Sequence, residues 1–380
     1  METRDTEILL GLIRYAVWNT EMKEAVDWPI YEEMKRQAIA TLPAGILNKI
    51  EMNSALRQTW KMTNYQQIAY NVNYSRLQAQ LPITVPFVIL KGTAAAKYYP
   101  DPRLRNMGDI DIMPRREDFD TAYRQFLEQG YQIEKNFERE TGFVKDGVMV
   151  ELHRSFAKLN DPAYAAYLDD LIIANINETH ELPDAVNGLV LLEHISQHLA
   201  NGLGLRQIID WMLFVDQCLP DAAWPAFETL TEKIGLKTLA VVTTRMCEMY
   251  LGLPDRAWCA GADEGICRQL MDYVLESGNF GSKRVDDQSV SENVFVYARN
   301  PIATFKLLQK KRNEKLDARP ALRVGQALCL AVSGGAICKK GFIAAACGGS
   351  AENGACECQK KKGNAGCAGC ASGFQGPCGV

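Results

Sequence analysis

The sequence lacks the features of a membrane-spanning or exported protein. No run of about 18 uncharged apolar residues occurs, which is the minimum length for a transmembrane helix. The start, METRDTEILLGLIRYAVW, has neither the basic beginning nor the small-residue cleavage site of a signal peptide. We therefore expect a cytoplasmic protein that makes no contact with a membrane.

The sequence also lacks an excess of positive charge. It has 42 lysines and arginines against 46 aspartates and glutamates, for a formal net charge of −4. General binding to nucleic acid requires a basic surface, so this balance argues against that class of protein. With 47% hydrophobic and 23% charged residues, the composition is that of a globular protein able to bury a large core. A length of 380 residues suggests roughly two domains.

Cysteine is scarce over most of the chain. Four of the twelve cysteines lie in the first 328 residues, and the other eight lie between Cys329 and Cys378. The body of the chain is therefore typical of a reduced protein without disulfides. Segment 319–380 is rich in glycine, alanine and cysteine and has no apolar periodicity, so we expect it to be disordered or non-native.

Three alternatives account for this Cys/Gly-rich tail. A zinc knuckle is one, because Cys356-x-Cys358 and Cys367-x2-Cys370 have near-zinc spacing. A disulfide cluster is the second, although a reducing compartment disfavours it. A shifted reading frame is the third, because codons for residues 324–331 read one base later can spell a Trp- and Pro-rich sequence. The DNA sequence would decide among them.

The order of apolar patterns predicts an α+β fold with a small mixed β-sheet core and N- and C-terminal helical regions. Residues 1–80 form the N-terminal region, helical from residue 7 with one break near Leu42-Pro43. Residues 81–156 form the core, and 157–318 form the C-terminal helical domain. No long βαβ series occurs, so a doubly wound parallel sheet is excluded.

The core block alternates short β-branched runs with helix-forming runs. Its helix over 116–130 is amphipathic, with Phe119, Ala122, Tyr123, Phe126 and Leu127 on one face. The other elements are strands at 83–90 and 109–114, a helix-prone stretch at 92–99, and a hairpin over 140–153 with Asp146-Gly147 in its turn.

Two aspartates stand two residues apart in the strand DIDIMP. Side chains alternate along a strand, so Asp109, Asp111 and Met113 share one face, and Ile110 and Ile112 form the opposite, buried face. The carboxylates are then about 6–7 Å apart at 3.3 Å per residue. Two like charges this close require a positive charge between them, and a divalent cation is the natural solution.

Two further stretches support a metal and phosphate site. In VMVELH, alternation places Glu151 on a different face from its valine and leucine neighbours, which offers a third carboxylate. In VILKGTAAAKYY, a strand passes into a helix through Lys91-Gly92-Thr93. Gly92 lets backbone amides approach a phosphate, and Thr93 adds a hydroxyl. Lys91 adds a positive charge, although a lysine at a strand end is usually solvated.

The combined pattern LKGT-x3-K, R-x-R-x2-GDIDI and ELH resembles the polymerase-β-like nucleotidyltransferase superfamily. Within it, the sequence is most similar to a bacterial group called the uncharacterised nucleotidyltransferases, over residues 85–155 and more loosely over 185–215. The resemblance implies that Asp109, Asp111 and Glu151 hold Mg²⁺ or Mn²⁺ and are the catalytic residues. It also implies that the nucleotide is bound by Lys91, Gly92, Thr93 and Arg105.

The activity implied is transfer of a nucleoside monophosphate from an NTP to an acceptor hydroxyl, with release of pyrophosphate. The acceptor, small molecule or macromolecule, is not indicated by the sequence. The pattern is also similar to aminoglycoside nucleotidyltransferases and to nucleotidyltransferase toxins, which differ in the acceptor. A catalytically inactive nucleotide-binding or interaction protein on the same fold is the alternative, and the three intact carboxylates argue against it.

The remaining histidines give weaker signals. His194 and His198 are four residues apart on an expected helix, but the glutamate of a zinc-protease motif is absent between them. Arg206 and Asp210 have the same spacing, which favours an ion pair within one helix. The stretch around these four residues would line the acceptor side of a cleft. His153 is expected to support the site or to be hydrogen-bonded in the core.

Overall fold

The computed structural model describes residues 3–279. The predictions for segment 319–380, including the zinc and disulfide alternatives, lie outside these residues. The N-terminal part forms helices α1 (Thr3–Trp18), α2 (Trp28–Arg36) and α3 (Ser54–Ala79). The prediction of a single break near Leu42-Pro43 was wrong, because the chain leaves the helix twice. Asn19 adopts a left-handed φ of 59° after α1, and irregular turns separate α2 from α3.

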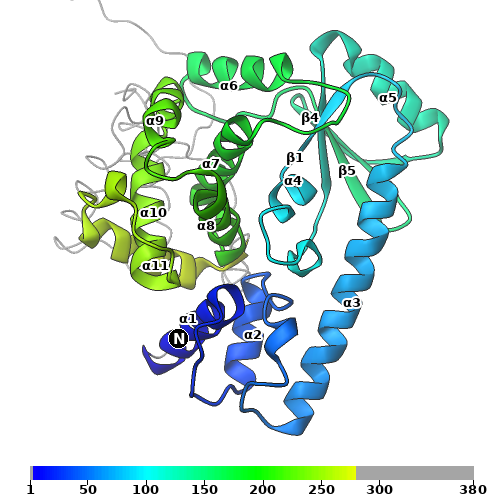
Figure 1. Ribbon diagram of the computed structural model, residues 1–380. Coiled ribbons are helices and arrows are strands. Elements are labelled where there is room, and N and C mark those ends of the chain that lie inside the picture. Colours follow the sequence, from blue (N-terminus) through cyan, green and yellow to red (C-terminus); the bar gives the residue numbers. More distant parts are fainter. Residues whose placement is uncertain (1–2, 280–380) are drawn as a thin grey trace, which may run out of the picture. The chain divides into compact units, whose positions relative to one another are not determined.

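Five strands form one mixed sheet in the order β1-β2-β5-β4-β3 (Figure 1). Strands β2 and β5 are parallel, and the other neighbouring pairs are antiparallel. The α+β class with a small mixed sheet is therefore confirmed. The strands are β1 (Phe87–Leu90), β2 (Ile110–Pro114), β3 (Gln132–Asn136), β4 (Glu140–Lys145) and β5 (Val148–His153).

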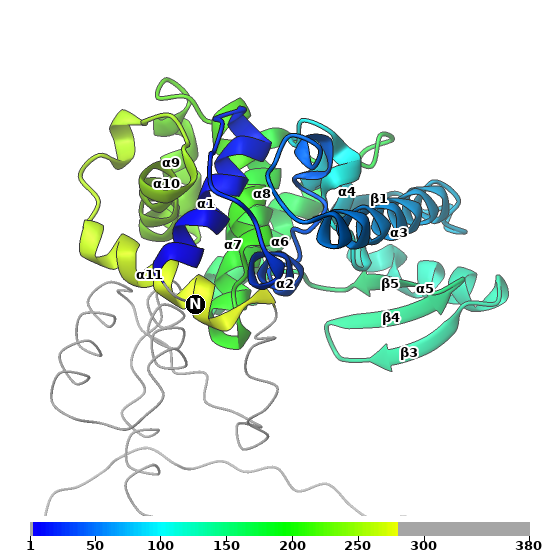
Figure 2. The same ribbon diagram turned by 90° about the horizontal axis from the view of Figure 1, so that it is seen from below.

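The predicted hairpin is confirmed as β4 and β5. Asp146 and Gly147 both have positive φ, at 51° and 75°, as a two-residue hairpin turn requires. Strand β3 was not predicted, because its sequence QIEKN is mostly polar. It is the outer edge of the sheet, where charged side chains are common because they oppose pairing with another chain. Figure 2 shows β3 and β4 at this outer edge.

The two faces of the sheet enter two different hydrophobic cores. Ile110 and Ile112 of β2 pack in one core with Phe119 and Phe126 of α5 (Phe119–Glu128). Met113 belongs to the other core, which the surrounding helices share. The predicted alternation of faces along β2 is therefore confirmed.

The predicted helix over 116–130 is α5 preceded by the 3-10 turn η3 (Arg116–Asp118). The placement of Leu127 on its apolar face was wrong, because this side chain is 42% exposed. Successive helical residues are 100° apart, so Leu127 lies about 80° around the helix from Phe119, at the margin of the apolar stripe. The strand predicted at 83–90 begins only at Phe87, directly after Pro86, which has no N–H to donate to a neighbouring strand.

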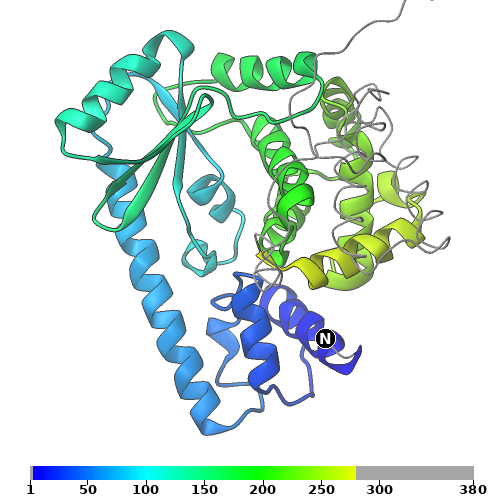
Figure 3. The same cartoon turned by 180° about the vertical axis from the view of Figure 1, so that it is seen from behind.

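The helices that follow the sheet in the chain lie to one side of it (Figure 1). Figure 3 shows α3 running from the N-terminal helices to the sheet. No helix in the part of the chain from residue 3 to 279 has the length and apolarity needed to cross a membrane. The later helices are α6 (Pro162–Ala174), α7 (Asp184–Asn201), α8 (Leu205–Cys218), α9 (Trp224–Lys233), α10 (Lys237–Leu251) and α11 (Glu264–Ser277).

Candidate nucleotidyl-transfer site

The strand register brings the predicted acidic residues together. Asp111 of β2 pairs directly with Glu151 of the parallel strand β5, and Leu90 of β1 pairs with Asp111 on the other side. Asp109 directly precedes β2 and Lys91 directly follows β1, so all four polar residues meet at one place. They line a cavity of about 250 Å³ between the sheet and helices α7 and α8.

Lys91 is the positive charge that the paired carboxylates require. Its Nζ lies 2.7 Å from Oδ1 of Asp111, and its side chain is only 12% exposed. Lys91 is therefore buried against a carboxylate, and is not solvated as lysines at strand ends usually are. The backbone of Lys91 has φ 53° and ψ −133°, a conformation that costs a non-glycine residue on the order of 1–3 kcal/mol. The surrounding fold imposes this strained turn, which directs the ammonium group at the carboxylates.

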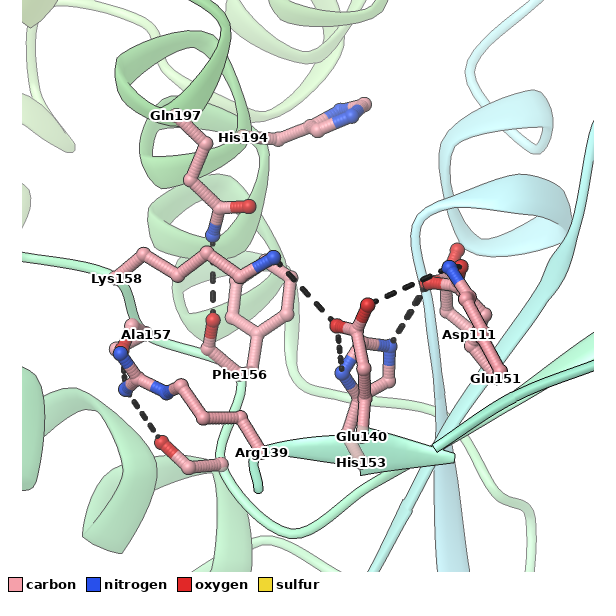
Figure 4. A network of polar contacts seen from close by, with 12 residues as sticks. Asp111, Arg139, Glu140, Glu151, His153, Phe156, Ala157, Lys158, His194 and Gln197 are labelled. Carbon is pink, nitrogen blue, oxygen red and sulfur yellow. Dashed lines mark hydrogen bonds and ion pairs between the residues drawn. The ribbon is translucent and has the colours of Figure 1, made fainter. Parts of the chain in front are cut away.

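A second layer of charged groups supports the carboxylates from the far strands (Figure 4). Lys135 of β3 makes a short ion pair with Glu151 and lies 3.4 Å from Glu140 of β4. Nε2 of His153 lies 2.9 Å from Oδ1 of Asp111, while its Nδ1 lies 3.6 Å from Oε2 of Glu140. Glu140 also lies 3.5 Å from Nζ of Lys158. The expectation that His153 supports the site agrees with this contact to Asp111.

The electrostatics are those of a crowded anionic site. Burial and the neighbouring charges of Asp111 and Asp109 raise the pKa of Glu151 to about 7. Burial also raises the pKa of Asp111 to about 6, against the opposing effect of Lys91. Although burial opposes it, the charge of Lys91 lowers the pKa of Asp109 to about 2. One carboxylate is thus firmly ionised, while the other two retain protons up to nearly neutral pH.

The Lys91-Gly92-Thr93 turn packs against helix α3. Gly92 has φ +36°, and an added Cβ would lie 2.2 Å from the hydroxyl of Tyr74. That hydroxyl donates to the backbone carbonyl of Asp109 at 3.0 Å. The hydroxyl of Thr93 donates to Gln78 at 3.0 Å. The helix that follows, α4 (Gly92–Ala96), is only five residues long. Contact of Gly92 and Thr93 with a triphosphate stays a prediction.

Arg105 has a protein partner in this structure. Its Nε and Nη2 donate to Asp210 of α8 at 2.8 and 2.7 Å, and the hydroxyl of Tyr99 adds a third bond to the same carboxylate. The exposed fractions of the two charged side chains are 3% and 1%. Asp210, the partner that helical spacing suggested for Arg206, binds Arg105 from the loop before β2. Arg206 donates to the backbone carbonyl of Asn106 at 3.1 Å.

Helix α7 forms the wall of the cavity opposite the carboxylates. His194 and His198 both line it, and their Nε2 atoms lie 2.9 Å apart in a mutual hydrogen bond. Burial and the nearby charge of Lys91 lower the pKa of His198 to about 3, so the ring is neutral. The prediction that this stretch lines the acceptor side of a cleft agrees with its position on the cavity. Its role toward an acceptor stays a prediction.

The residues present fit a divalent cation. Asp111, Glu151 and His153 each place one ligand atom within 4.8 Å of the others. Carboxylate oxygens are the ligands that Mg²⁺ and Mn²⁺ prefer. Burial and the mutual repulsion of the carboxylates raise the pKa values of Asp111 and Glu151 against the opposing charge of Lys91. A cation at this position would relieve that repulsion, and its binding would release protons.

Several residues of the site were not found from the sequence. Lys135, Glu140 and Lys158 reach the cavity only because β3 and β4 lie beside β5 and because the chain turns back after His153. The backbone N–H groups of Phe156 and Ala157, in that returning segment, both donate to Asp169 of α6 at 3.0 and 2.9 Å. Gly142 in β4 was the one feature of the local sequence that pointed to these residues. A glycine inside a strand marks a place where another part of the chain approaches closely.

The mixed sheet, with an Asp-x-Asp strand beside a strand carrying a third carboxylate, defines a nucleotidyltransferase-like core. A family model described as uncharacterised nucleotidyltransferase matches residues 25–252, and the chain belongs to that family. The family resemblance seen in the motifs is thereby confirmed. No curated protein and no solved structure matches the chain.

Proposed function

We propose that this protein is a metal-dependent nucleotidyltransferase. It transfers a nucleoside monophosphate from an NTP to an acceptor hydroxyl and releases pyrophosphate. The observation that supports this most is the pairing of Asp111 with Glu151 across β2 and β5, beside Asp109 and at the wall of a cavity. Family membership supports the same general activity. The metal, Mg²⁺ or Mn²⁺, would be held by Asp109, Asp111 and Glu151.

The bound metal would neutralise triphosphate charge and bring the attacking and leaving oxygens into line. The protein's own residues have distinct tasks around it. Asp109 stays ionised because its pKa is about 2. Lys91 and Arg206 provide positive charge at the cavity wall for the phosphates. Glu151, with a pKa of about 7 in the metal-free site, would either hold the acceptor-side metal or accept the proton of the acceptor hydroxyl at a carboxylate oxygen.

The acceptor is a small molecule or a macromolecule of unknown class. Antibiotic-modifying and toxin-like roles differ from each other only in this acceptor. A catalytically inactive nucleotide-binding or interaction protein on the same fold is the second candidate. In the described residues all three carboxylates are present and face the same cavity, which favours the enzyme.

The test is incubation of the protein with each of the four labelled NTPs, Mg²⁺ or Mn²⁺, and a cell extract as the source of acceptor. We expect pyrophosphate release and label transfer that depend on the metal and disappear in Asp109→Asn. The same NTP should raise the melting temperature only when metal is present. Metal-dependent binding without turnover would favour the inactive binding protein. No melting shift with any NTP would contradict both nucleotide-binding proposals.

A further inference from the structure

His153 lies beside two of the carboxylates that would hold the metal ion. Its Nε2 is 2.9 Å from Oδ1 of Asp111 and 3.6 Å from Oε2 of Glu151. In octahedral coordination, two ligand atoms at right angles and each about 2.1 Å from the ion are about 3.0 Å apart. These two atoms are hydrogen-bonded in this structure, and their spacing also matches that of neighbouring ligands of a single ion.

The other ring nitrogen of His153 faces a carboxylate. Nδ1 lies 3.6 Å from Oε2 of Glu140, and it has no hydrogen-bond partner among residues 3–279. The ring itself is 2% exposed. Lys135 and Lys158 hold Glu140 in place from two sides. Histidines that bind metals nearly always donate their second N–H to a carboxylate or carbonyl, which fixes the ring and raises its basicity. Glu140 is the carboxylate that faces Nδ1 of His153, and it would accept this N–H in the metal-loaded site.

We propose that His153 is a metal ligand through Nε2, with Glu140 as its positioning residue, and that this nitrogen makes the site prefer Mn²⁺ over Mg²⁺. The inference rests on the metal-dependent function proposed above. Mg²⁺ takes oxygen ligands and loses its water reluctantly, whereas imidazole is a good ligand for transition-metal ions. A carboxylate site that also contains one imidazole therefore selects against Mg²⁺ more strongly than a site of carboxylates alone.

The direct test is pulsed electron paramagnetic resonance of the full chain loaded with Mn²⁺, which detects ¹⁴N nuclei bound to the ion. The chain has only four histidines, so the source of a nitrogen signal is identified by single substitutions. We expect the signal in the unmodified protein and its loss in His153→Asn. His180→Asn is the matched control, because that ring stacks on Phe87 away from the cavity and should leave the signal intact.

Metal affinity gives the second readout. His153→Asn should weaken Mn²⁺ binding by more than about tenfold and Mg²⁺ binding by much less, so that the Mn²⁺/Mg²⁺ ratio falls. Glu140→Gln should weaken Mn²⁺ binding by about 10- to 100-fold, the usual effect of removing such a partner, while the nitrogen signal persists. This variant keeps the proposal testable if His153→Asn fails to fold.

The outcomes separate the two proposals. Bound Mn²⁺ without a ¹⁴N signal, or a signal that survives His153→Asn and disappears in His194→Asn, would overturn the role of His153 and leave the metal-dependent transferase intact. An unchanged Mn²⁺/Mg²⁺ ratio in folded His153→Asn would overturn it as well. Absence of Mn²⁺ binding even with an NTP present would overturn both.

Discussion

The side chain of Lys135 passes directly over Gly142 to reach Glu151. These three residues lie in one row across neighbouring strands, since Lys135 pairs with Gly142 and Gly142 pairs with Glu151. A Cβ atom on Gly142 would lie 2.7 Å from Cγ of Lys135 and 2.9 Å from its Cε. The absence of a side chain at position 142 is what allows a lysine on the edge strand to contact the third carboxylate of the site.

Gly142→Ala should therefore disturb the site through Lys135. The added methyl group displaces the lysine stem and frees Glu151, so we expect about a tenfold loss of pyrophosphate release, with little change in the midpoint of thermal unfolding. The check is a double-mutant cycle with Lys135→Ala, in which Gly142→Ala should have no further effect. Additive losses from the two changes would show that Gly142 acts independently of Lys135.

Asp111→Asn should separate chemistry from stability. Because burial raises the pKa of Asp111 to about 6, the carboxylate that is ionised at pH 8 lowers the stability of the folded state relative to the unfolded chain. We expect the free energy of unfolding to be unchanged or higher, and turnover to fall by about a thousandfold through loss of a metal ligand. The comparison is Ile110→Ala on the buried face, which should cost roughly 2–5 kcal/mol of stability and leave the folded fraction active. A destabilised but fully active Asp111→Asn protein would make the aspartate structural.

Arg105→Met should test whether this arginine serves the fold or the nucleotide. Removing one partner of a buried ion pair leaves the other charge uncompensated, which costs about 3–5 kcal/mol. We expect this loss in urea unfolding, and recovery of much of it when Asp210→Leu is added. A variant of normal stability with a raised KM for NTP would instead support the predicted contact between Arg105 and the triphosphate.

Glu193 should make stability fall as the pH rises toward neutrality. Burial raises its pKa to about 7 from an ordinary value near 4.5. The folded state holds the proton of Glu193 more tightly than the unfolded state does. The contribution of this proton to the free energy of unfolding is therefore complete below about pH 4.5 and lost as the pH rises through 7. Glu193 accepts from the backbone N–H of Lys158 at 2.7 Å, which a glutamine at this position preserves.

Between pH 5 and 8, the free energy of unfolding of the unmodified protein should fall because Glu193 loses its proton. In Glu193→Gln this fall should be smaller by about 1–3 kcal/mol. Urea unfolding at a series of pH values measures this difference. Glu178→Gln, on an exposed loop, is the matched control and should leave the pH profile unchanged. An identical profile for Glu193→Gln and the unmodified protein would show that Glu193 is ionised in the folded state at neutral pH.

The site residues that lie within single short strands could be predicted from the sequence. Alternation along β2 and β5 was enough to separate Asp111 and Glu151 from their apolar neighbours, because strand periodicity is a local property. The position of Lys135 was not predictable in this way. It depends on strand order and on an irregular register between Ile133 and Lys135, which no local pattern encodes.

The same distinction applies to the partners of Asp210. The spacing of Arg206 and Asp210 is a valid signal for a contact on an isolated helix. The competing partner, Arg105, is 105 residues away in the sequence and reaches Asp210 only when the loop before β2 packs on α8. The forked contact between Arg105 and Asp210 has the geometry that makes a buried arginine–carboxylate pair strong, and no local spacing predicts it.

The separation between Arg105 and Asp210 also has a consequence for the time at which the site is completed during protein synthesis. At about 5–20 residues per second, a ribosome that has just added Arg105 needs about 5–20 seconds to add Asp210. The wall carrying His194 and Arg206 is made within the same interval. The acidic strands therefore exist for seconds as a nascent chain without the opposite wall of their cavity, so a competent catalyst arises only after α8 has left the ribosome.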